Sequence, residues 1–266
     1  MCIANTVGRG GKNDPADVEI VQILLNLSIR KFPGTQRAAL ATDGRIGVNS
    51  IEAIVAFETQ VLGMAASDGL IVPCDATMKA LLANVPRDAW KEKLEIALPT
   101  ASMSNIELYF EPLVDRTYKY GIRSDLQLAH FIAQVGVESD GLLYAEELAS
   151  GAAYEGRRDL GNTEPGDGQR FKGRGLIQIT GRKNYAAYTT HSGIDYVQQP
   201  DLLATDPMIA VESACWFWNT HACGQFADQD NIREVTRRIN GLPDGPNTHL
   251  DRRMAILARA KAVLGI

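Results

Sequence analysis

Apolar residues recur every three or four positions along most of this chain, a spacing that predicts amphipathic helices. The clearest helix is expected to begin at Ser124, a candidate N-cap with Gln127 three residues later. Its inward face carries Leu128, Phe131, Ile132 and Val135. Glu138 continues that face near the end of the helix, which Asp140 and Gly141 terminate. Because desolvation favours a protonated carboxyl group, Glu138 suits a general acid, although a solvated last-turn acid has the same spacing.

The same periodicity predicts a mainly α protein with two domains. Residues 1–88 should form a small three-helix module, with helices over residues 14–30, from Asn49 and around Thr77. Residues 89–266 should form a larger α-rich domain, whose other helices are expected over residues 103–120, 184–191 and 231–239, and from residues 206 and 248. The segment GRGLIQIT, residues 173–180, alternates apolar and polar side chains and predicts a short strand or hairpin.

Composition excludes some classes of protein without indicating a substrate. The chain is 45% hydrophobic, and its net charge of −5 lacks the basic excess of a nucleic-acid binder. No segment is apolar enough for a membrane span or a signal peptide, so we expect the protein to start in a cytoplasm. Its four cysteines should stay reduced there. Nothing in the sequence indicates an oligomer, so we expect a monomer. We expect no protein partner. One local group of basic residues could contact an anionic polymer or form a solvated face: Arg157, Arg158, Arg170, Lys172, Arg174, Arg182 and Lys183.

Polar side chains gather in and just after the GRGLIQIT segment. Gln178 and Thr180 are two residues apart, which places them on one face of a strand. Asn184 and Tyr185 follow closely. Amide and hydroxyl groups on one face suit the binding of a sugar or the orientation of a water molecule.

Four blocks of this region form a recognisable set: Glu138-Ser139, the acid Glu147, residues 154–157, and residues 171–180 with Asn184-Tyr185. Together they resemble the family 19 glycoside hydrolases, and most closely their bacteriophage endolysin branch. The resemblance covers roughly residues 95–266 and implies an α-rich, lysozyme-like fold with a minor β-hairpin. Val137 departs from the pattern, because many relatives have histidine at this position, and the change alters the hydrogen bonds available to Glu138.

This resemblance implies that two carboxyl groups hydrolyse a β-1,4 glycosidic bond with inversion. Glu138 would be the general acid and Glu147 the base that activates water, with the adjacent Glu146 as its rival. Inversion requires the two carboxyl groups to lie ~6.5–9.5 Å apart. Thr180 would help to orient the water. The expected substrate-binding residues are Gln178, Asn184, Tyr185, Asn240 and Arg252.

The N-terminal module carries a second resemblance, in the stretch DGRIGVNSIEAIVAFE at residues 43–58. Over residues 10–85 the chain resembles the small three-helix peptidoglycan-binding domains of cell-wall hydrolases. The resemblance implies that residues 1–88 bind the cell wall. A docking or folding appendage without a ligand is the alternative.

Together the two resemblances imply an endolysin, a lysozyme that cuts bacterial peptidoglycan between N-acetylmuramic acid and N-acetylglucosamine and so lyses a host cell. Such an enzyme would wait in the host cytoplasm until the membrane is permeabilised. A chitinase and a non-catalytic wall-binding protein are the alternatives. A zinc amidase would need a histidine-rich ligand set, but no HExxH pair is formed by His130, His191, His221 or His249. Cys215, His221 and Cys223 have no second ligand cluster, so we expect neither a metal nor a cofactor.

Overall fold

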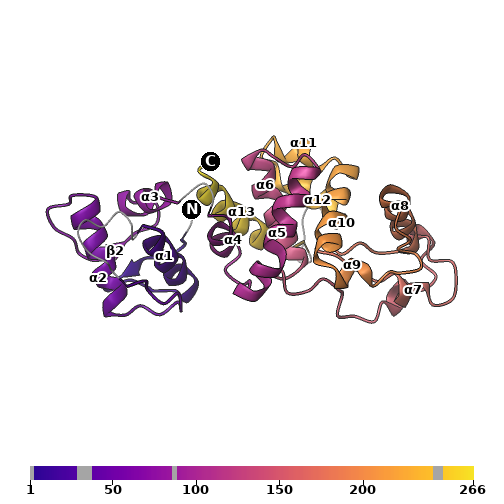
Figure 1. Ribbon diagram of the computed structural model, residues 1–266, viewed down its shortest axis with the longest axis horizontal. Coiled ribbons are helices and arrows are strands. Elements are labelled where there is room, and N and C mark those ends of the chain that lie inside the picture. The colour runs from indigo at the N-terminus through magenta and orange to yellow at the C-terminus, as the bar shows by residue number, and fades with distance from the viewer. Residues whose placement is uncertain (1–2, 29–37, 86–88, 242–247) are drawn as a thin grey trace. The chain divides into compact units, whose positions relative to one another are not determined.

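The computed structural model describes residues 3–28, 38–85, 89–241 and 248–266, and within these ranges the protein is mainly helical (Figure 1). The chain divides into two compact units, Met1–Pro99 with Ala258–Ile266, and Thr100–Leu257. The division follows Pro99 rather than residue 88, because helix α4 (Trp90–Ala97) packs against α1 (Pro15–Ser28).

The first unit is built around α1, which contacts α2, α3 and α4. In chain order the elements of this unit are β1 (Val7–Gly8), α1 (Pro15–Ser28), α2 (Val48–Ala56), the π-helical segment η2 (Phe57–Val61), β2 (Leu70–Ile71), α3 (Ala76–Ala83) and α4 (Trp90–Ala97). The two short strands pair antiparallel, with Val7 opposite Ile71. Asn49 was expected to cap helix α2, but the N-cap is Gly47, two residues earlier, and Asn49 lies inside the helix.

One carboxyl group of the first unit titrates far from its ordinary range. Glu95 of α4 is half-buried and lies near Glu19 of α1 and Glu92. Burial, followed by the charges of these two neighbours, raises the pKa of Glu95 to about 7. The protonation of Glu95 therefore changes near neutral pH.

The second unit is a bundle of helices with a long irregular excursion between two of them. Its elements in chain order are α5 (Met103–Lys119), α6 (Asp125–Glu138), the 3₁₀ segments η3 (Ala152–Tyr154) and η4 (Arg158–Leu160), α7 (Asp167–Arg170), α8 (Arg182–Ser192), α9 (Leu202–Thr205), α10 (Pro207–Thr220), α11 (Cys223–Ala227), α12 (Ile232–Asn240) and α13 (Leu250–Leu264). Helices α5 and α10 lie side by side, and α6 packs on α11 and α12 (Figure 1). The last turns of α13 belong to the first unit.

Local sequence explains where several of these helices begin. The Ser124 hydroxyl accepts a hydrogen bond from the Gln127 amide at 3.1 Å, so α6 starts where the sequence predicted. The other half of the capping box does not form, because the Gln127 side chain donates to both carboxylate oxygens of Asp228, at 2.9 and 2.8 Å. Asp206 caps α10 and Asn231 caps α12 in the same way as Ser124.

The GRGLIQIT segment forms a tight turn, in which isolated β-bridges take the place of a strand. A single antiparallel bridge joins Arg174 and Ile179, whose backbone groups exchange hydrogen bonds of 3.1 and 2.8 Å. Gln178 lies in the left-handed region with φ of +58°, so strand alternation does not decide where its side chain points. The expected strand is therefore replaced by a turn, and a second bridge connects Arg174 to Glu146.

Candidate active site

Glu138 is the last residue of α6, and its carboxyl group contacts a buried arginine. The Nη2 atom of Arg253 lies 2.5 Å from the Glu138 Oε1 atom, and the Glu138 side chain is 17% exposed. Arg253 itself is 1% exposed and donates further hydrogen bonds to the Gln134 side chain and the Thr248 carbonyl. Gln134 in turn donates to Thr236 at 3.3 Å. Groups from α6, α12 and α13 therefore fix the carboxyl group of Glu138.

The environment of Glu138 is less apolar than the helical periodicity suggested. The ion pair with Arg253 puts a charged group beside the carboxyl group and restricts the rotamers of Glu138. The sequence analysis missed Arg253, although one signal was present: Arg253 continues the buried face of α13, together with Ile256, Leu257 and Ala260.

The arginine expected at the cleft, Arg252, lies beside a different acid. Its Nη2 atom is 2.6 Å from the Asp140 Oδ1 atom, and both side chains are about half exposed, at 46% and 52%. Consecutive residues of a helix point about 100° apart, so a shift of one position changes which acid an arginine reaches. The arginine that contacts Glu138 is therefore Arg253 and not Arg252.

A compact turn after Glu138 brings a second acidic segment against the GRGLIQIT turn. The Ser139 hydroxyl accepts a hydrogen bond from the Leu142 amide at 2.9 Å, and both Asp140 and Leu142 have positive φ. Gly141 is required in this turn, because a Cβ atom there would lie 2.6 Å from the Thr100 hydroxyl. Residues 145–147 then pair with residues 173–175 through backbone hydrogen bonds.

Among the described residues, the hydrogen-bond donors to the carboxylate of Glu147 are uncharged. The Tyr154 hydroxyl donates to its Oε1 atom at 3.0 Å, and the Gly173 amide donates to its Oε2 atom at 3.2 Å. The backbone of Glu147 is fixed by a hydrogen bond to the Gly173 carbonyl at 2.9 Å. This arrangement orients the carboxylate, while the nearby Lys172 ammonium group donates to the Glu147 backbone carbonyl at 3.1 Å.

Glu146 has the opposite environment. Its Oε1 atom lies 3.0 Å from the Arg174 Nε atom and 3.3 Å from the Lys172 Nζ atom. Arg174 is almost fully buried and also binds Asp201 at 2.8 Å. A carboxylate held by two cations is a poor proton acceptor, so the geometry favours Glu147 over Glu146 as the general base.

Gln178 and Glu147 meet above Gly173. A Cβ atom at Gly173 would lie 2.8 Å from the Gln178 Oε1 atom and 3.3 Å from the Glu147 Oε2 atom. Thr180 and Asn184 lie beside them, half-buried, and each donates one hydrogen bond to the backbone of this turn, at 2.9 and 2.8 Å. The structure therefore places Gln178 and Thr180 in one turn, with Gln178 beside Glu147 and Asn184 of α8 bonded to the end of the turn.

Two of the expected sugar-binding residues lie elsewhere. Tyr185 is fully buried, its hydroxyl donates to the Lys172 carbonyl at 2.7 Å, and its ring packs on Phe171. Burial raises the pKa of Tyr185 to about 12. Tyr185 therefore supports the turn from inside. Because it is buried, it does not contact a sugar in this structure, contrary to the expectation. Asn240 is exposed at the end of α12, beside residues 242–247, which lie outside the described residues.

The excursion between α6 and α8 holds Tyr154 in place. Asn162 is fully buried, and its side chain donates to the Tyr154 carbonyl at 2.9 Å. Glu155 accepts hydrogen bonds from the Gly166 and Gly168 amides, each at 2.8 Å. The sequence analysis assigned no role to Tyr154, because only the folded excursion brings its hydroxyl to Glu147.

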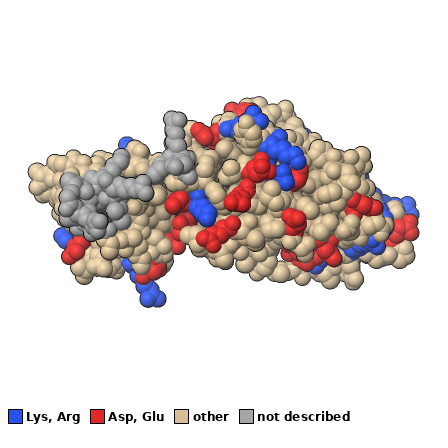
Figure 2. Space-filling view, viewed as in Figure 1, with Lys and Arg blue, Asp and Glu red and all other residues tan. Residues whose placement is uncertain are grey.

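Most of the basic group in this region is paired within the protein. Arg157 binds Asp159, Arg182 binds the buried Asp167, and Lys172 and Arg174 bind Glu146. On the face seen in Figure 2, acidic and basic side chains are interspersed. Ion pairs within the protein therefore engage four of the seven basic side chains of this group.

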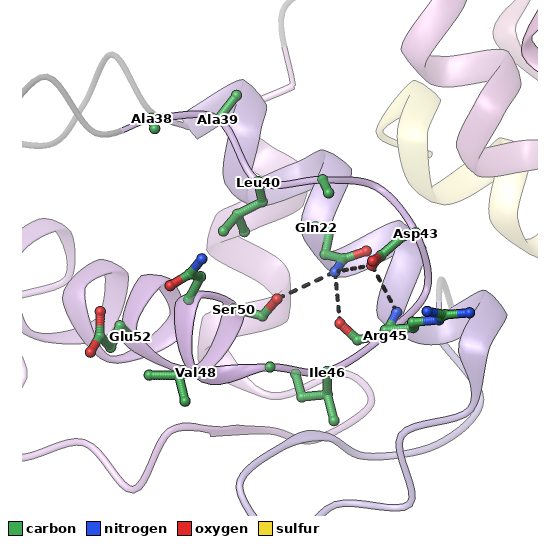
Figure 3. A pocket seen from close by; sticks show the side chains of 13 residues that line it. Gln22, Ala38, Ala39, Leu40, Asp43, Arg45, Ile46, Val48, Ser50 and Glu52 are labelled. Carbon is green, nitrogen blue, oxygen red and sulfur yellow. Dashed lines mark hydrogen bonds between the residues drawn. The ribbon is translucent and has the colours of Figure 1, made fainter.

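The first unit contains a pocket of about 680 Å³, which includes much of the stretch that resembles wall-binding domains. Gln22 lies at its floor and bonds to Asp43, Ser50 and the Arg45 carbonyl (Figure 3). The pocket walls include the charged side chains of Asp43, Arg45 and Glu52. Gln22 thus cross-links the loop at residues 43–45 to α2.

The described residues contain no group of three possible metal ligands. Cys215 and Cys223 are both buried, and burial raises the pKa of each thiol, to about 12 for Cys223. The His221 ring packs on Phe217 at 3.7 Å between centroids, and its Nδ1 atom lies 3.0 Å from the Phe217 carbonyl oxygen. None of the described helices combines the length and apolarity that crossing a bilayer requires.

Comparison with known proteins places this site in a family. The sequence pattern of class I chitinases, glycoside hydrolase family 19, matches residues 127–233. A glycosyl hydrolase family 19 domain-containing protein of Haemophilus influenzae is 32% identical over 158 residues, which are 48% of this chain and 76% of that protein. The acidic endochitinase Q of Nicotiana tabacum is 37% identical over 107 residues, but these span only 40% of each protein.

The fold agrees with the sequence comparison. Chitinase C from Streptomyces griseus HUT6037 superposes with a TM-score of 0.55 at 22% identity, over 66% of this chain and 91% of that one. This likeness covers the α-rich architecture that the sequence predicted for the larger domain. On the sequence match to the Haemophilus protein, the chain belongs to glycoside hydrolase family 19, a family of glycosidases.

Proposed function

We propose that this protein hydrolyses the β-1,4 bond between N-acetylmuramic acid and N-acetylglucosamine in bacterial peptidoglycan, with Glu138 as general acid and Glu147 as general base. The observation that carries this assignment is the contrast between the neighbouring acids: Glu147 is held by neutral donors, whereas Glu146 is paired with Arg174 and Lys172. A base must accept a proton, and the carboxylate of Glu147, which is not held in an ion pair by Lys172 or Arg174, suits that role better than Glu146.

In this mechanism Glu138 donates its proton to the leaving glycosidic oxygen as the bond to the anomeric carbon breaks. Glu147 removes a proton from a water molecule, whose oxygen attacks that carbon from the opposite face and inverts its configuration. The carboxyl separation that inversion requires, ~6.5–9.5 Å, is part of the proposal. Thr180 helps to orient the water, while Gln178 and Asn184 hold the sugar.

The first unit supports a cell-wall substrate. Its pocket of about 680 Å³ is lined by Asp43, residues 45–50 and Glu52 of the stretch that resembles peptidoglycan-binding domains. We propose that this unit retains the enzyme on the wall and that the protein is a monomeric endolysin of bacteriophage type. In this role it accumulates in the host cytoplasm and reaches the wall after the membrane is permeabilised.

The test is mass spectrometry of the fragments released from purified peptidoglycan by the wild type and by Glu138→Gln. Reducing N-acetylmuramic acid ends, produced by the wild type alone, are the expected result. Reducing N-acetylglucosamine ends would assign a glucosaminidase instead, and anhydromuramic ends a lytic transglycosylase. Free peptide stems from both proteins would refute the glycosidase mechanism at this site.

A chitinase is the second candidate, because the tobacco relative and the Streptomyces structure bear that name. Parallel assays on purified peptidoglycan and colloidal chitin distinguish the two substrates. We expect the initial rate on peptidoglycan to exceed that on chitin at equal concentrations of reducing ends. The reverse ratio would assign a chitinase with the same pair of carboxyl groups. Wall binding that Glu138→Gln leaves intact, without hydrolysis by either protein, would indicate a non-catalytic wall-binding protein.

A further inference from the structure

The second unit contains another pocket, away from Glu138 and Glu147. It has a volume of about 600 Å³, within the range of ~300–1,000 Å³ that small-molecule sites occupy. Its walls come from the C-terminal ends of α5 and α8, the loop that follows α8, and α10. The residues used below are Lys119, Tyr120, His191, Ile194, Tyr196 and Asn219, with Glu212 between them.

The charge at the centre of this pocket is already compensated. Glu212 accepts hydrogen bonds from Lys119 at 2.6 Å and from the Tyr120 hydroxyl at 3.1 Å, and Arg116 lies 3.3 Å from its carboxylate. The Tyr120 hydroxyl also lies 3.0 Å from the His191 Nε2 atom. A charged ligand would compete with these pairs, so the site favours a neutral ligand.

The pocket wall combines hydrogen-bonding groups with a layer of buried aromatic rings behind it. Tyr196, which is only 1% exposed, stacks on Tyr188 at 4.8 Å between centroids, and Tyr188 packs on Trp216 at 5.1 Å. These rings support the wall, and Ile194, which is 41% exposed, offers apolar surface to a ligand. Lys119 is 55% exposed and has three donor hydrogens, more than its contact with Glu212 uses. The Asn219 amide nitrogen donates to the Tyr120 carbonyl at 2.9 Å, and its amide oxygen is the acceptor that this pocket-lining residue can offer to a ligand.

These features complement an acetamido group on a sugar ring. Lys119 can donate to the acetamido carbonyl, Asn219 can accept from its N–H group, and Ile194, which is 41% exposed, offers apolar surface to the methyl group. Neutral sugars need donors, acceptors and an aromatic or aliphatic face together, and the pocket supplies all three.

Helix α8 connects this pocket to the candidate active site. Asn184 lies in its first turn and His191 in its last, so the two are separated by roughly 10 Å along the axis at 1.5 Å per residue. A glycan strand with several sugar units is long enough to cover that distance.

From this geometry we propose that the pocket is a second carbohydrate site, which binds an N-acetylhexosamine unit of the polymer that the enzyme cleaves. The inference rests on the proposed glycosidase function. Its effect is to hold a long glycan strand on the catalytic unit while one bond is cut. Short oligosaccharides, which cannot reach both sites, do not benefit.

The first test is an NMR titration of the full-length Glu138→Gln variant, which prevents turnover, with N,N′,N″-triacetylchitotriose. Amide shifts at residues 119–120 and 191–194, in addition to those near Glu147, are the expected result. Shifts near Glu147 alone would overturn the second site and leave the proposed function standing. No shifts at either place, together with no hydrolysis by the wild type, would refute the proposed function itself.

The second test uses Lys119→Ala and Asn219→Ala in the active enzyme. Each should raise the KM for the polymeric substrate at least threefold and leave kcat/KM for a soluble trisaccharide unchanged. Arg123→Ala is the matched control, because Arg123 lies in the same unit, packs on the exposed Tyr118 ring and does not line the pocket. Equal KM values for the control and both variants would overturn the proposal.

Discussion

Replacing Arg253 by methionine tests how the candidate acid is held. The substitution keeps much of the side-chain volume but removes the hydrogen bonds to Glu138, Gln134 and the Thr248 carbonyl. Because Arg253 is 1% exposed, its three hydrogen-bond acceptors would lose their donor in a largely buried site. Breaking a buried pair on one side costs about 3–5 kcal/mol.

The lower end of that range applies here, because the Glu138 side chain is 17% exposed and water can hydrate part of it. We therefore expect the free energy of unfolding to fall by about 3 kcal/mol. Because a misplacement of about 1 Å can cost 10²-fold in rate, kcat should fall by about 10²-fold. The assays are urea unfolding followed by circular dichroism, and hydrolysis of purified peptidoglycan under conditions where the variant is folded.

Arg252→Met is the matched control in the same helix. Its partner Asp140 is 52% exposed, and an exposed pair contributes only about 0–1 kcal/mol. We expect near-wild-type stability and a kcat within about twofold of the wild type. If Arg252→Met proved the more damaging change, or if Arg253→Met retained full kcat, the assignment of Arg253 to Glu138 would be wrong.

Three further predictions concern the second acid, the turn beside it and the first unit. Glu147→Gln should lower kcat by about 10³-fold, because it removes the proposed base. Glu146→Gln should lower the free energy of unfolding by about 1 kcal/mol and leave kcat nearly unchanged. Equal losses of kcat in the two variants would contradict the choice of base. Gly173→Ala should raise KM several-fold with little change in melting temperature. The new methyl group would lie 2.8 Å from the Gln178 Oε1 atom and so displaces that side chain. An unchanged KM would argue against Gln178 as a sugar contact. Folding raises the pKa of Glu95 from 4.5 to about 7, so Glu95 binds more protons in the folded state than in the unfolded state. Its contribution to stability is therefore present below pH 4.5 and is lost as the pH rises through 7. Because the side chain is only half-buried, that loss should be about 1 kcal/mol after solvent screening, and Glu95→Gln should remove it; parallel stability–pH curves for the two proteins would refute the reasoning.

Local sequence by itself determined most of the helices and several of their boundaries. The spacing of Leu128, Phe131, Ile132 and Val135 predicted α6, and Ser124 caps it as expected. A helix and its cap are formed by residues within four positions of one another, so their signals survive in a single sequence. The family was also recognisable from sequence, because its motif blocks are short and contiguous.

Only the tertiary structure decided which side chains work together. Glu146 and Glu147 are neighbours of the same chemical type, and they differ because residues about 26 positions later, Lys172 to Arg174, pair with one and leave neutral contacts to the other. Arg253 reaches Glu138 across 115 positions. The buried face of α13 separates Arg253 from the exposed Arg252, but it does not show which acid Arg253 contacts. Tyr185 lies in a motif block but faces the core, because its place on α8 packs its ring on Phe171 and brings its hydroxyl to the Lys172 carbonyl. Such long-range choices depend on how helices and turns pack, and that packing is the physical information that periodicity along one chain does not contain.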